Sequence, residues 1–98
     1  MNIGIEPEHL KKILGVFRTH PQIKDVLLFG SRANGNYREG SDIDLALKGN
    51  KLASQLLTQI SMDYDALYLP WKLDVIIYDQ IENAELKDHV DRVGVSLF

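Results

Sequence analysis

The sequence predicts a small α+β domain in which a mixed β-sheet of three or four strands carries helices packed on one face. Helix-like and strand-like apolar patterns follow one another in the order helix, strand, strand, helix, strand, helix. The 98 residues are enough for one hydrophobic core and too few for a second folding unit. We therefore expect residues 1–98 to form a single two-layer domain.

The first helix is predicted to begin at Pro7, because proline suits the first helical turn. Apolar residues then recur at the spacing of one buried helical stripe, at Leu10, Ile13, Leu14 and Phe17. Pro21 ends this helix, since the residue before a proline avoids the helical region. Residues 24–29 follow as a strand, and their continuous apolar run is typical of a strand covered on both faces.

A polar loop punctuated by Gly30, Gly35 and Gly40 leads into a second strand over residues 42–48. Polar and apolar residues alternate along this strand, so Asp42 and Asp44 share one face and the intervening apolar residues share the other. Two carboxylates side by side on a rigid strand repel each other. Their pairing is explained if a divalent cation lies between them.

A third strand, predicted over residues 71–78, carries a third acid. It follows a helix over residues 51–66, for which Asn50 is a candidate cap. Asp74 lies on the face opposite the apolar row of Leu73, Val75 and Ile77. If this strand lies beside the second, three carboxylates converge on one surface, which is costly without metal because each charge raises the pKa of its neighbours.

The C-terminal region is predicted to hold a helix over residues 83–93. Its buried residues are expected to be Leu86, Val90 and Val93, and Gly94 is expected to end it. The remaining apolar residues, 95–98, are compatible with either a short strand or a docked tail.

Composition restricts the classes of function. Apolar residues make up 45% and charged residues 26%, as in ordinary globular proteins, and the net charge of −3 argues against non-specific nucleic-acid binding. The absence of cysteine excludes a disulfide framework and a thiolate zinc site. No signal peptide and no run of 18 apolar residues is present, so a cytoplasmic protein without a membrane span is expected.

The motif Gly30-Ser31, ten residues, then Asp-x-Asp resembles the signature of the DNA polymerase β-like nucleotidyltransferases. The wording FGSRANG…SDIDLAL and the short chain resemble the minimal nucleotidyltransferase (MNT) proteins. Gly-Ser-x10-Asp-x-Asp arises by chance in a chain of this length with a probability on the order of 10⁻³ at average residue frequencies. The resemblance implies a nucleotidyltransferase-like mixed sheet in which the acid-bearing strands are adjacent.

We expect Asp42, Asp44 and Asp74 to be the catalytic residues and the ligands of two Mg²⁺ ions, with Asp74 also accepting the proton of the attacking hydroxyl. Gly30 and Ser31 are expected to bind the nucleotide, because glycine lets the backbone approach a phosphate and the hydroxyl donates to a phosphate oxygen. Two arginines are candidate phosphate cations, Arg32 in the motif and Arg38 in the loop.

The predicted reaction is Mg²⁺-dependent transfer of a nucleoside monophosphate, AMP from ATP, to an acceptor hydroxyl with release of pyrophosphate. MNT proteins are typically paired with a small helical HEPN protein, so the resemblance implies an antitoxin that adenylylates a tyrosine of a HEPN toxin. Two alternatives stay open: a non-catalytic or nucleotide-binding module that neutralises a partner by covering it, and nucleotidyl transfer to a small molecule or an RNA end.

Other residues with functional potential are expected to have structural roles. His9, His20 and His89 lie in separate segments without metal-ligand spacing, which favours surface or capping roles. Trp71 and Tyr68 are expected to pack the corner between a helix and the third strand.

Overall fold

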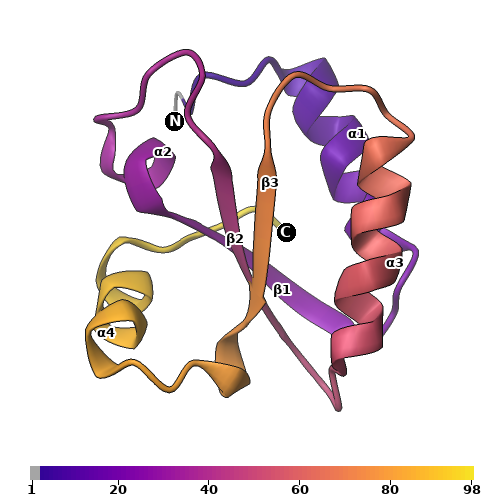
Figure 1. The fold of residues 1–98 in the computed structure, drawn as a ribbon. Coiled ribbons are helices and arrows are strands. Elements are labelled where there is room, and N and C mark those ends of the chain that lie inside the picture. Colours follow the sequence, from indigo (N-terminus) through magenta and orange to yellow (C-terminus); the bar gives the residue numbers. More distant parts are fainter. Residues whose placement is uncertain (1–2) are drawn as a thin grey trace.

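The structure of the protein is a computed structural model that describes residues 3–98. This part of the chain forms a four-stranded sheet in the order β3-β2-β1-β4 (Figure 1). β1 (Ile23–Phe29) pairs antiparallel with β2 (Ile43–Gly49) and with β4 (Val95–Ser96), whereas β2 and β3 (Leu73–Ile77) are parallel. The predicted mixed sheet with adjacent acid-bearing strands is confirmed.

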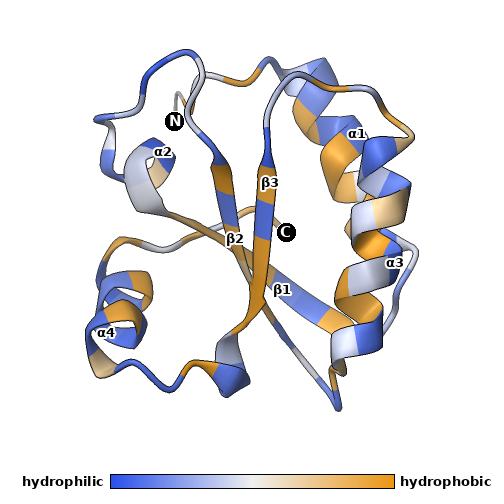
Figure 2. Cartoon of the chain, in the orientation of Figure 1, coloured by the Kyte–Doolittle hydropathy of each residue, from blue (hydrophilic) through white to orange (hydrophobic). Residues whose placement is uncertain are grey.

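Helices cover both faces of this sheet, whereas the sequence predicted helices on one face. α1 (Pro7–Arg18) and α3 (Ser54–Asp65) pack on the first face, and α4 (Ala84–Val93) packs against the second (Figure 1). All three helices carry both hydrophobic and hydrophilic residues, as expected of helices with one buried side (Figure 2). α4 reaches the second face because the chain turns there through a 3₁₀ helix, η1 (Tyr78–Gln80), directly after β3.

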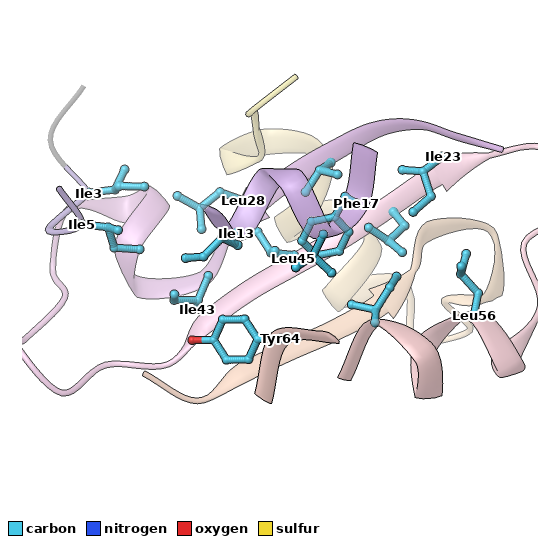
Figure 3. Packing of buried hydrophobic residues seen from close by; sticks show 14 residues of the cluster. Ile3, Ile5, Ile13, Phe17, Ile23, Leu28, Ile43, Leu45, Leu56 and Tyr64 are labelled. Atoms are coloured by element: carbon cyan, nitrogen blue, oxygen red, sulfur yellow. The ribbon is translucent and has the colours of Figure 1, made fainter. Parts of the chain in front are cut away.

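The main hydrophobic core lies between the first face of the sheet and the helices α1 and α3 (Figure 3). Phe17 of α1, Leu45 of β2 and Ile60 of α3 are each fully buried there. A smaller cluster on the second face joins Phe29, Ala46 and Val90. Since Leu45 and Ala46 are neighbours on β2, the alternation predicted from the sequence separates the two clusters.

The N-terminal cap of α4 is a hydrogen-bonding side chain, whereas the cap predicted for α3 is not formed. Asn83 caps α4, and its Oδ1 accepts hydrogen bonds from the backbone N–H groups of Glu85 (2.9 Å) and Leu86 (3.1 Å). The prediction that Asn50 caps the helix that follows it is wrong, because α3 begins at Ser54 and its N-cap residue is Ala53.

The C-terminal residues, which the sequence left undecided, contribute a strand. Val95 and Ser96 lie opposite Leu28 and Leu27 of β1 in the antiparallel register. This pairing places β4 at one edge of the sheet and leaves β3 at the other. Among residues 3–98, no helix is long and apolar enough to cross a membrane.

Candidate active site

The three predicted acids lie on the face of the sheet opposite the main core. The parallel register places Asp44 of β2 directly opposite Asp74 of β3, and Figure 2 shows hydrophilic bands side by side on the two strands. Asp42 immediately precedes β2 and shares the parity of Asp44. The intervening residue Ile43 is buried in the main core, so the strand cannot rotate the acids away without exposing apolar surface.

These acids interact electrostatically. The pKa of Asp44 lies above its ordinary value, first because burial penalises the charged carboxylate and then because Asp74 and Asp42 repel it. His89 partly offsets this rise. The arrangement therefore favours binding of a cation or a proton over a bare set of negative charges.

The turn after β1 approaches the acids directly. Gly30 has φ +74°, and a Cβ atom at this position would overlap Oδ2 of Asp44, so both the backbone conformation and the close approach favour glycine. Gly30 also begins α2 (Gly30–Asn34), a short helix that ends at Gly35 with φ +85°. Ser31, the second residue of α2, is half-buried next to this turn. The structure thus brings the two halves of the sequence motif, the Gly-Ser turn and Asp44, into contact.

Arg32 has different partners from the phosphates expected for it. Its side chain is only 2% exposed, and Nη1 donates to the carbonyl oxygen of Ile3 at 2.7 Å. Nη2 and Nε donate to the carbonyl oxygen of Ser41 at 2.8 and 3.2 Å. Because Ser41 directly precedes Asp42, Arg32 fixes the loop that delivers the first acid to the site. The other candidate cation, Arg38, lies exposed in the same loop.

His89 is a residue of the site that the sequence analysis placed in a surface or capping role. The backbone N–H of Gly30 donates to His89 Nε2 at 3.1 Å, and the imidazole packs edge-to-face against Phe29, with ring centroids 6.1 Å apart. His89 precedes Val90, the buried residue of α4, but a contact across 59 residues of sequence leaves no local signal.

Of the two aromatic residues expected to pack the corner between a helix and the third strand, Trp71 does so and Tyr68 does not. Trp71 packs edge-to-face against His9, and its carbonyl oxygen accepts the hydroxyl of Tyr64 at 2.6 Å. Tyr68 is 92% exposed and has a left-handed backbone with φ +52°, so the expectation that it packs this corner is wrong.

The donor chemistry of the site fits Mg²⁺, although residues 3–98 contain no group of three acidic or histidine side chains close enough to form a ready-made metal cage. Mg²⁺ binds through one or two carboxylates and takes its other oxygens from water and substrate phosphates. The mutual repulsion at Asp44 is relieved by such an ion. The three carboxylates are therefore suited to an ion that arrives with a phosphate-bearing substrate.

Comparison with known proteins gives a consistent result. The sequence profile described as "Polymerase beta, Nucleotidyltransferase" matches residues 11–98. A predicted protein adenylyltransferase of Methanocaldococcus jannaschii is 32% identical over 80 residues, which cover 74% of this chain and 76% of that protein.

Solved structures share the fold at lower identity. A chain of a toxin–antitoxin complex with AMP-PNP has a TM-score of 0.74 at 22% identity, covering 91% of this chain and 72% of that one. A chain of the complex between a tri-AMPylated Shewanella oneidensis HEPN toxin and its MNT antitoxin has a TM-score of 0.70 at 21% identity, covering 96% and 72%. A predicted nucleotidyltransferase from Sulfolobus solfataricus has a TM-score of 0.57 at 21% identity, covering 92% and 76%. At these identities the likeness shows the fold alone.

The raised pKa of Asp44 predicts the sign of a stability change. The folded state holds the Asp44 proton more tightly than the unfolded state does. Ionisation of this residue therefore lowers the free energy of unfolding as the pH rises above the ordinary pKa of an aspartate. We expect Asp44→Asn to raise the thermal midpoint of the metal-free protein at pH 7. This gain should shrink as the pH falls toward and below 3.8, the ordinary pKa of the group, because the carboxyl then becomes protonated in both states.

Thermal unfolding between pH 4 and pH 7 measures this difference. Asp79→Asn, an exposed acid of η1, is the control, and its effect should be smaller at pH 7. A lower midpoint for Asp44→Asn than for the wild type at pH 7 would contradict the prediction.

The hydrogen bond from Gly30 to His89 predicts how two substitutions differ. His89→Phe keeps a ring against Phe29 and removes the acceptor, whereas His89→Gln removes the ring and keeps an acceptor. Because one backbone hydrogen bond contributes about 1 kcal/mol, the Gly30 amide should exchange with solvent about fivefold faster in His89→Phe. His89→Gln should restore most of the protection. NMR-detected hydrogen exchange measures both, and equal exchange in the wild type and His89→Phe would show that only ring packing matters.

Proposed function

The chain belongs to the polymerase β family of nucleotidyltransferases, and from this premise we propose that it transfers AMP from ATP to a hydroxyl of a partner protein. The observation that carries the proposal is the contact between Gly30, at the Gly-Ser turn, and Asp44, which lies opposite Asp74 on the adjacent strand. Such a site presents a phosphate-binding turn beside a set of metal-binding carboxylates.

The similar proteins support the choice of AMP as the transferred group and of a protein as the acceptor. The archaeal relative is named for protein adenylyl transfer, and two structures of similar fold contain AMP-PNP or an AMPylated HEPN toxin. We propose that the acceptor is a tyrosine of a HEPN-type toxin and that this chain acts as its antitoxin. Adenylylation would place a bulky, negatively charged group on the toxin.

The residues of the chain divide the chemical work. The acceptor oxygen attacks the α-phosphorus of ATP, the bond to the β-phosphate oxygen breaks, and pyrophosphate leaves. Asp74, which is exposed, accepts the proton of the attacking hydroxyl. The Ser31 hydroxyl donates to an oxygen of the departing phosphates. Catalysis is mainly positioning and charge neutralisation.

We propose that Asp42, Asp44 and Asp74 hold two Mg²⁺ ions together with the substrate. When bound, Mg²⁺ neutralises the charge of the phosphate oxygens and favours ionisation of the acceptor hydroxyl. Arg32 contributes indirectly, because its hydrogen bonds to the Ser41 carbonyl hold the residue that precedes Asp42.

Label transfer tests the proposal. The purified chain, radiolabelled ATP, Mg²⁺ and a HEPN-type protein encoded beside it should yield labelled HEPN protein. Asp42→Asn should reduce the rate at least about a hundredfold, since it removes a group that acts on the developing charge of the transition state. EDTA should abolish transfer, and Asp79→Asn should leave the rate nearly unchanged.

The same assay separates transfer from simple covering of the partner. If the Asp42→Asn, Asp44→Asn double variant still neutralises the toxin as well as the wild type does, neutralisation proceeds by covering. An absence of label in the wild-type reaction would overturn adenylylation of this acceptor.

A further inference from the structure

We infer that the open edge of β3 binds an extended segment of the acceptor protein, which joins the sheet as a further strand and carries its hydroxyl to Asp74. This inference rests on the proposed function and states where the acceptor binds. It follows from the sheet order, the hollows along β3 and the register of Asp74.

The edge of β3 is open for strand pairing. Within residues 3–98, β3 pairs with β2 alone. The carbonyl oxygen of Lys72 accepts the N–H of Ile43 at 2.9 Å, so the backbone groups of Lys72 point toward β2. Because these groups alternate in direction along a strand, those of Leu73 and Val75 point toward the open edge. Such an edge is a template for an added strand.

Two hollows follow this edge along its length. One, of about 670 Å³, lies between α3 and residues 71–75, and the other, of about 320 Å³, lies between residues 75–77 and the start of α4. Leu57 and Val75 line both, so the hollows meet at the middle of the strand. An added strand would find hollows for its side chains at successive positions along its length.

The charges along the edge indicate the chemistry of the occupant. The charged residues that line the two hollows are three acids and one base: Asp65, Asp74, Glu82 and Lys72. This excess of negative charge favours a segment with Lys or Arg beside its apolar residues. Tyr68 lines the larger hollow with its side chain 92% exposed, and an exposed tyrosine is a frequent anchor at protein interfaces.

The register explains why this edge suits the reaction. Residues that lie opposite one another on neighbouring strands point to the same face of a sheet, as Asp44 and Asp74 do. A residue opposite Asp74 on the added strand therefore projects toward the face that carries the acids. Since neighbouring strands lie about 4.8 Å apart, its hydroxyl would come within reach of the Asp74 carboxylate.

Val75→Pro tests the backbone contribution. Proline removes the outward N–H of Val75 and leaves the groups that pair with β2, whereas the control Val75→Ile keeps this N–H. Val75→Pro should lower the rate of label transfer to the HEPN-type protein at least about fivefold while ATP binding is retained, and Val75→Ile should resemble the wild type. Equal transfer by a folded Val75→Pro variant and the wild type would overturn the inference.

A second pair of variants changes only exposed side chains. Tyr68→Ala changes an exposed side chain that lines the larger hollow, and Met62→Ala changes an exposed α3 side chain (62%) that lines neither. Only Tyr68→Ala should slow label transfer. Equal slowing by both, or by neither, would contradict the inference.

Hydrogen exchange separates this inference from the proposed function. Addition of the HEPN-type protein should protect the amides of Leu73 and Val75, whether or not label is transferred. Protection without transfer would support the docking edge and overturn the proposed reaction. Transfer without protection would support the reaction and overturn the docking edge. Protection that appears in the chain alone as its concentration rises would show that a second copy occupies the edge, and would overturn the proposed occupant.

Discussion

The parallel register of β2 and β3 is the constraint on which the rest of the site depends. It places Asp44 opposite Asp74, and the pKa of Asp44 rises first because the carboxyl is partly buried and then because Asp74 repels it. Packing on the opposite face of the sheet stabilises this register, because Ile43 and Leu45 of β2 are buried in the main core. A slip of one residue would bury the acids and expose these side chains, so hydrophobic packing maintains an electrostatically unfavourable arrangement.

Three further contacts, made by residues of α2 and α4, complete the site around this register. The turn at Gly30 passes so close to Asp44 that a Cβ atom at Gly30 would overlap the Asp44 carboxylate. His89 of α4 accepts the N–H of Gly30 from the second face of the sheet. Arg32 binds the carbonyl of Ser41 and so fixes the entry of the chain into β2. Each contact joins segments that are distant in sequence or separated by a loop, and together they position the acids and the turn for a nucleotide.

The open edge of β3 gives an acceptor protein access to Asp74. A nucleotidyltransferase must bring an acceptor hydroxyl to its carboxylates as well as hold its nucleotide. In this chain β4 occupies the far side of β1, and the strand that carries Asp74 lies at the edge of the sheet, flanked by two hollows. The topology thus leaves the proposed proton acceptor accessible to a segment from another protein.

The sequence alone was enough to predict the order of α1, β1, β2, α3, β3 and α4, the faces of Asp42, Asp44 and Asp74, and the family, because alternation and motif spacing are local properties of the chain. It did not determine that α4 covers the second face, since an amphipathic stripe such as that of Val90 does not specify which side of a sheet it will meet. Nor did it reveal the roles of His89 and Arg32. Both depend on backbone groups, of Gly30 for one and of Ile3 and Ser41 for the other, and a backbone N–H or carbonyl is the same at every position until tertiary folding brings a side chain to it.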